Sequence, residues 1–95
     1  MILETAVLSV KPGLSADFEA DFAIAGQYIS SIEGYLGHSL HKCLEQSDQY
    51  LLLVQWRELE DHTVGFRESE AYLSWKKLLH HYYEPFPTVE HYVQV

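Results

Sequence analysis

The sequence YLLLVQWRELEDHTVGFR, residues 50–67, decides the fold, because an extended segment passes within it directly into a helical one. Consecutive aliphatic side chains at Leu51–Val54 predict a strand over Tyr50–Arg57 that is apolar on both of its faces. The stretch Glu60–Arg67 predicts a short helix. A strand with two apolar faces must be covered on both sides, so the neighbouring segments determine the architecture.

The segments before this stretch supply a strand, a helix and a second strand. Residues 2–10 are rich in β-branched and apolar side chains and end at a Lys-Pro-Gly turn signal, which predicts the first strand. Apolar residues recur every three or four positions over Leu14–Ile32, which predicts an amphipathic helix closed by Gly34. Residues 35–45 alternate as in a strand, and a short loop joins them to residues 50–57 as an antiparallel hairpin.

The segments after it supply a helix and a last strand. Ser69 can cap a second helix that runs to about Tyr82, and residues 88–95 predict a strand after two prolines. The order βαββαβ predicts an α+β, ferredoxin-like fold with a four-stranded antiparallel sheet and both helices on one face. A chain of this length has room for one domain, residues 1–95.

The side chains on the second face of the predicted sheet indicate that another chain covers it. In a monomer that exposes this face to water, an antiparallel sheet alternates apolar with polar side chains. Here residues 2–10 and 51–54 are apolar in both phases. A large exposed apolar face marks an interface, so the sequence predicts a homodimer through the sheet face.

The charge balance narrows the possible partners further. Six basic residues against fourteen acidic ones give a net charge of −8, which argues against nucleic acid and against an anionic membrane surface as binding partners.

The cysteine content and the length of the apolar runs bear on the location of the protein. Cys43 is the only cysteine, so no disulfide can form within the chain. No apolar run approaches the roughly 18 residues of a membrane span. Together these features predict a soluble cytoplasmic protein.

Metal and cofactor sites have no recognisable motif. His38 and His41 lie three apart on a predicted strand and therefore point to opposite faces. The adjacent His80 and His81 diverge on a predicted helix. Glycine-rich fingerprints for flavin or nicotinamide are absent. We therefore expect no metal and no cofactor.

The last third of the chain carries a family resemblance. A predicted strand ends in Trp56 and is followed by Asp61-His62, then by Phe66 with Ser69 three positions later, then by an aromatic helix and a final strand. This order resembles the antibiotic biosynthesis monooxygenase (ABM) family, part of the dimeric α+β barrel superfamily. The resemblance implies a barrel-like dimer, in a family that spans oxygenases, isomerases and proteins without a known activity.

The resemblance also implies a substrate pocket. In family members that oxidise polycyclic phenols, a tryptophan that matches Trp56 lines this pocket. The asparagine, tyrosine and arginine of those members correspond here to Leu52, His62 and Lys76. Lys76 is thus the catalytic candidate that would pair with a substrate oxygen. Trp56 is expected as a pocket wall that stacks on a flat ligand, and the alternative is that it only fills the core.

His62 is the expected general base, because an ordinary histidine titrates near neutral pH. The alternative is an exposed histidine on the first turn of a helix. Phe66 is expected as a second pocket wall, and Tyr72 could replace the lysine as the partner of a substrate oxygen. Glu90 and His91 lie on opposite faces of the last strand, so one of them faces the cavity, and His91 is the substrate-binding candidate.

These expectations combine into a function. A cofactor-independent monooxygenase acting on a small phenol or quinol needs a base and a water-poor aromatic pocket, because a deprotonated electron-rich ring can itself reduce dioxygen. Two alternatives use the same barrel: a non-catalytic small-molecule binding or stress-response protein, and a small-molecule isomerase. Fold alone does not separate them.

Overall fold

The computed structural model describes residues 1–95 as one sheet packed against a layer of helices. In chain order the elements are β1 (Ile2–Ser9), α1 (Ser15–Ile29), β2 (Tyr35–Lys42), β3 (Gln49–Trp56), η1 (Asp61–Phe66), α2 (Glu70–Leu79), η2 (His80–Tyr82) and β4 (Val89–Tyr92). The strands are antiparallel in the order β2-β3-β1-β4. This arrangement confirms the predicted α+β, ferredoxin-like βαββαβ fold.

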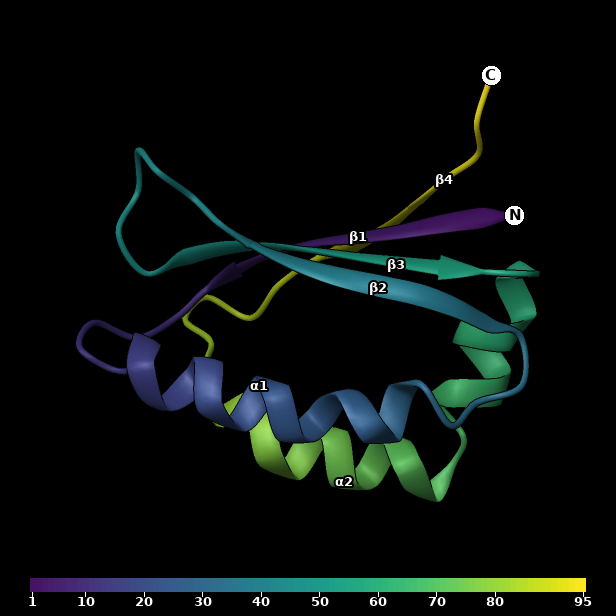
Figure 1. Cartoon of the computed structure of the whole chain (residues 1–95), viewed down its shortest axis with the longest axis horizontal. Helices are drawn as coiled ribbons and strands as arrows, with labels where there is room; N and C mark the ends of the chain where they lie inside the picture. The colour runs from purple at the N-terminus through teal and green to yellow at the C-terminus, as the bar shows by residue number, and fades with distance from the viewer.

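Both α-helices lie on the same face of the sheet, as Figure 1 shows. Alternate side chains of β1 and β3 point toward the helices and are buried there, as the period of a strand requires. The largest fully buried side chains are Trp56, Tyr50, Phe18 and Phe66. Aromatic rings therefore fill much of the space between the sheet and the helices.

The corner after β3 is a short helix with unusually wide turns. The helix predicted there has the π-type hydrogen-bond pattern over Asp61–Phe66, a rare form that is frequent at functional sites. α1 ends at Ile29, earlier than predicted, and Gly34 shapes the following loop with a φ of +92°. A Cβ on Gly34 would lie 2.1 Å from the Asp61 carboxyl group. Only glycine fits, so this loop and the start of η1 pack directly together.

Ser69 begins α2 as predicted. Its Oγ accepts a hydrogen bond from the backbone N–H of Tyr72 at 3.1 Å, which satisfies one free donor of the first turn. Trp75 and Leu79 face the core, and the helix tightens into η2, so helical structure reaches Tyr82 as the sequence predicted. α2 thereby closes one side of the space between the sheet and the helices.

No helix covers the opposite face of the sheet (Figure 1). At its centre Val7 lies opposite Leu51 in the β1–β3 ladder, and these residues are 50% and 38% exposed. Polar side chains such as Thr5 and Gln55 share this face. The open face therefore has the predicted apolar side chains at its centre, but polar side chains lie around them. None of the helices is both long enough and apolar enough to span a membrane.

Candidate functional site

A cavity lies between β1, α2 and the segment that leads into β4. Its free volume is about 80 Å³. Its apolar and aromatic wall is formed by Ala6, Leu8, Leu52, Phe66, Tyr72, Trp75, Tyr83, Phe86, Pro87 and Val89. Four polar side chains join this wall: Glu4, His62, Arg67 and His80. Apolar walls with a few convergent polar groups are the composition expected of a small-molecule site.

Glu4 brings a carboxyl group into the core. It occupies an inward-facing position of β1 and is 5% exposed. Its Oε1 accepts a hydrogen bond from Trp56 Nε1 at 2.9 Å and lies 3.3 Å from His62 Nε2. Burial raises the pKa of Glu4, while the hydrogen bond from Trp56 and the charge of Arg67 partly offset that rise. This carboxylate therefore holds a proton more readily than an exposed one.

His62 is enclosed on η1, with 3% of its surface exposed. Its ring stacks on Trp56 with centroids 5.5 Å apart, and its Nδ1 lies 2.8 Å from His91 Nε2. Burial first, and then the charges of Arg67 and His91, lower the pKa of His62 to about 3. Both expectations for His62, exposure and titration near neutral pH, are therefore wrong, because the π-helical corner turns this side chain into the core.

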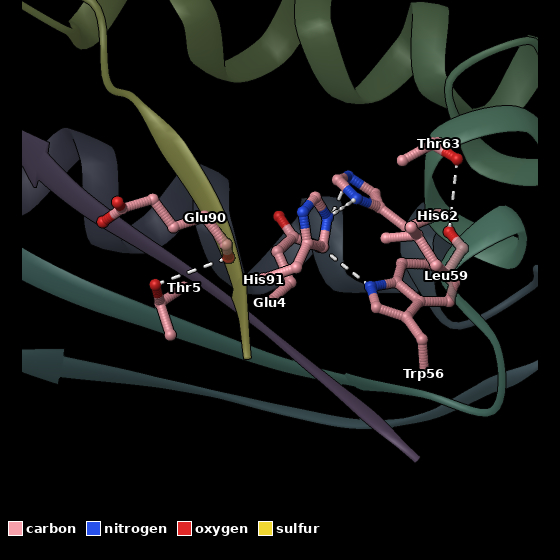
Figure 2. Close-up of polar contacts among 8 residues, drawn as sticks. All are labelled: Glu4, Thr5, Trp56, Leu59, His62, Thr63, Glu90 and His91. Atoms are coloured by element: carbon pink, nitrogen blue, oxygen red, sulfur yellow. Dashed lines mark hydrogen bonds and ion pairs between the residues drawn. The ribbon is translucent and has the colours of Figure 1, made fainter. Parts of the chain in front are cut away.

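β4 contributes the second histidine of the site. His91 lies opposite Glu4 in the β1–β4 ladder and shares its helix-facing side, whereas Glu90 lies opposite Thr5 on the open face. The inward-facing residue is thus His91. Figure 2 shows Glu4, His62 and His91 meeting beside Trp56, from β1, η1 and β4. His91 does not line the cavity, and it reaches the cavity wall only through His62.

Comparison with known proteins establishes the family. The sequence model of the antibiotic biosynthesis monooxygenases matches residues 1–78. The chain belongs to the ABM family. A Bacillus subtilis protein, YczJ, is 54% identical to it over 95 residues, which is 100% of both chains.

Solved structures agree with this assignment. A Bordetella bronchiseptica protein named for the ABM family is 36% identical, with a TM-score of 0.94 over 99% of this chain and 96% of that one. SnoaB from Streptomyces nogalater, a cofactor-independent oxygenase solved as a point mutant, is 18% identical. Its TM-score is 0.74 over 99% of this chain and 90% of that one, and at this identity the likeness concerns the fold alone.

Trp56 of this ABM chain lies behind the cavity and does not line it. The side chain is fully buried, which matches the alternative that it fills the core and corrects its expected role as a pocket wall. Trp56 acts on the site through its contacts with Glu4 and His62. Phe66 and Tyr72 do line the cavity, with ring centroids 5.1 Å apart in an edge-on contact.

The cation at the cavity is Arg67, and Lys76 is elsewhere. Lys76 is exposed on α2 and does not line the cavity, because neighbouring helical positions diverge by about 100° and Trp75 takes the inward one. Arg67 lines the cavity directly after η1. It takes part in none of the ion pairs of the chain, so its guanidinium has no carboxylate partner within the protein.

Sequence reasoning missed Glu4 and Arg67. For Glu4 a signal existed, because it stands in the same strand phase as Ala6 and Leu8, and a charged residue on a core-facing phase needs a buried partner. For Arg67 there was no such signal. Its place at the cavity follows from the π-helical corner, which the pattern of apolar residues does not reveal.

Proposed function

We propose that this chain is a cofactor-independent monooxygenase that oxidises a small phenol or quinol. The observation that carries the proposal is the contact between Glu4 and His62 on the wall of an aromatic cavity. A weakly acidic ring hydroxyl loses its proton only to a well-placed base in a site with little water. Membership of the ABM family and the likeness to SnoaB, a cofactor-independent oxygenase, support the same class of reaction.

The proposed reaction balances without a cofactor. Glu4 takes the proton of the ring hydroxyl, and the phenolate passes one electron to dioxygen. The ring radical and superoxide combine at a ring carbon as a peroxide, and loss of water leaves a carbonyl. One oxygen atom stays on the ring, and the other leaves as water with the hydrogens of the original O–H and C–H groups.

Glu4 is a better base in this scheme than His62 alone. A group with a pKa of about 3 accepts a phenol proton poorly, whereas burial raises the pKa of Glu4. His62 keeps a role as the hydrogen-bond partner that orients the carboxyl group. Arg67 is exposed, and its guanidinium at the cavity lining offers a positive charge that would stabilise the phenolate electrostatically.

The size of the cavity favours a substrate with a single ring. Its volume of about 80 Å³ is smaller than the roughly 150 Å³ of an engineered apolar cavity that binds benzene. A ring can therefore enter only if a side chain at the rim moves. Phe86 is 60% exposed there and has room to do so. Polycyclic phenols would require a larger rearrangement.

We also propose a homodimer through the open face of the sheet. Val7, Leu51 and Tyr92 are exposed on this face, and a second copy packed against it would remove them from water. Light scattering at micromolar concentration should give about twice the chain mass of 11.0 kDa. A stable monomer under these conditions would contradict the dimer.

The decisive experiment is oxygen uptake with single-ring hydroquinones, phenols and naphthols, with no cofactor added. We expect uptake with single-ring substrates, and a loss of about a hundredfold or more in kcat in Glu4→Gln, the usual scale for removing a general base. Glu90→Gln is the matched control, because it removes a carboxylate from the opposite face of the same ladder. It should leave uptake unchanged.

The alternatives give different results in the same assay. Tight binding of a phenol without any uptake would identify a binding protein. Product formation without oxygen consumption would identify an isomerase. Either result would overturn the monooxygenase proposal.

A further inference from the structure

Three titratable side chains form a continuous series that begins at the cavity wall and ends outside it. Glu4 Oε1 lies 3.3 Å from His62 Nε2, and His62 Nδ1 lies 2.8 Å from His91 Nε2. The two contacts use the two different nitrogens of one imidazole ring. His62 therefore stands between a carboxyl group on one side and a second imidazole on the other (Figure 2).

The two ends of this series lie in different surroundings. Glu4 is part of the cavity wall and is almost fully buried. His91 lies outside the cavity wall on β4, an edge strand of the sheet that pairs only with β1, and its side chain is half-buried. The series thus leads from the cavity to the edge of the sheet.

We propose that Glu4, His62 and His91 form a proton relay that connects the cavity with solvent at the edge strand β4. The purpose of the relay rests on the proposed monooxygenase function. In the proposed reaction the proton that Glu4 takes from the ring leaves with the departing oxygen as water, so the relay serves the resting site. Before a substrate binds, it lets Glu4 lose its proton to solvent without admitting water to the cavity.

Two protonation arrangements are compatible with the two contacts of the series. When Glu4 is ionised, the Nε2 proton of His62 faces the carboxylate oxygen 3.3 Å away, and His91 Nε2–H donates to His62 Nδ1. When Glu4 is protonated, its O–H donates to His62 Nε2, and His62 Nδ1–H donates to His91 Nε2. The second arrangement holds one proton more than the first. That proton enters or leaves at His91 Nδ1.

This transfer avoids a charged His62. Each ring gains a proton on one nitrogen as it loses one from the other, so both imidazoles are neutral in both arrangements. A neutral ring is what the surroundings of His62 favour, because burial and the nearby guanidinium of Arg67 hold the pKa of His62 at about 3. A relay that needed an imidazolium at this position would oppose both effects.

The other neighbours of Glu4 cannot carry the proton. Trp56 Nε1 only donates a hydrogen bond, and a guanidinium such as that of Arg67 does not give up its proton in a protein. His62 is the one contact of Glu4 that can both accept and donate. The path from the carboxyl group to solvent therefore runs through the two imidazoles.

Nitrogen NMR of the protein labelled at histidine tests the relay without any substrate. As the carboxyl signal of Glu4 titrates, the Nδ1 and Nε2 signals of His62 should exchange between the protonated and unprotonated types. Glu4→Gln should abolish this exchange, because the amide cannot take up the proton. His91→Phe should also abolish it, because the outer acceptor is gone. His41→Asn, on an exposed part of β2, is the matched control and should keep it.

Four outcomes would overturn the relay: a single His62 tautomer throughout the Glu4 titration, a doubly protonated His62, an exchange that survives His91→Phe, or a Glu4 that does not titrate in the folded protein. The result is separable from the oxygen assay. A tautomer exchange without oxygen uptake would keep the relay and reject the monooxygenase. Uptake without the exchange would do the reverse.

Discussion

The two ends of the space between the sheet and the helices differ in where their carboxyl groups lie, near the surface at one end and buried at the other. At one end the hydroxyl groups of Tyr50 and Tyr82 donate to Glu19 and Asp21, which are carboxylates of α1 near the surface. At the other end, the carboxyl group itself lies inside the core at Glu4. We call these the tyrosine end and the Glu4 end. At the tyrosine end the charged groups lie near the surface, whereas at the Glu4 end a carboxyl group is buried.

This difference indicates which end contains groups that core packing alone does not require. The tyrosine end fills the core with large rings and still places each charge where water can reach it. The Glu4 end encloses a carboxyl group and the imidazole of His62, which costs free energy even when both are hydrogen-bonded. Buried titratable groups with shifted pKa values on a cavity wall are typical of functional sites. We therefore propose that the functional site lies at the Glu4 end.

The largest effect should come from Trp56→Ala, because the ring supports the Glu4 end from behind. The side chain is fully buried, stacks on His62 and donates to Glu4. Its removal should lower the free energy of unfolding by about 3–5 kcal/mol, the range for large-to-small aromatic changes. Urea denaturation measures the loss. A loss below about 1 kcal/mol would show that the ring is not enclosed as described.

The secondary-structure elements could be predicted from the periodicity of apolar residues, but the directions of the site side chains could not. Periodicity fixed the strands, the helices and their order, because the apolar stripes of α1 and β3 repeat along the chain. The family resemblance, and not periodicity, suggested Phe66 and Tyr72 as site residues, and both line the cavity. Periodicity could not give the directions of His62 and Arg67, because these depend on a π-helical corner set by the fit of Gly34 against Asp61.

The site also depends on contacts between segments far apart in the sequence. Glu4, His62 and His91 come from three elements and meet only when β4 pairs with β1 in the observed register. A strand pattern shows that Glu90 and His91 face opposite sides, and the register decides which side is which. The shifted pKa of His62 then follows from its enclosure, which no local pattern contains.

Acid should destabilise the Glu4 end specifically. The pKa of His62 is about 3 in the folded chain, below its ordinary 6.5, so the unfolded chain takes up a proton first as the pH falls. The contribution of His62 to stability therefore falls by about 2–3 kcal/mol between pH 6.5 and pH 4.5. In His62→Phe the free energy of unfolding should depend less on pH by that amount. Urea denaturation across this range tests it.

Glu4 provides the control, because its effect has the opposite sign. Its raised pKa means that the folded chain takes up this proton before the unfolded chain does, and the resulting stability is lost as the pH rises through the folded pKa. Glu4→Gln removes this contribution and should make the loss on acidification steeper. If both variants changed the pH dependence in the same direction, the described burial of the pair would be wrong.

The smallest effect should come from Tyr50→Phe at the tyrosine end. This change removes the hydrogen bond to Glu19 but leaves that exposed carboxylate in water, so no buried group loses its partner. The free energy of unfolding should fall by about 1 kcal/mol or less at neutral pH. The hydrogen bond from Tyr50 lowers the pKa of Glu19, so the contribution is present above the ordinary value of 4.5 and disappears as the pH falls through the lowered pKa. Carboxyl NMR should show the pKa of Glu19 returning upward in the variant. A loss as large as that of Trp56→Ala would mean that the tyrosine end also holds a buried polar group, and the contrast between the two ends would fail.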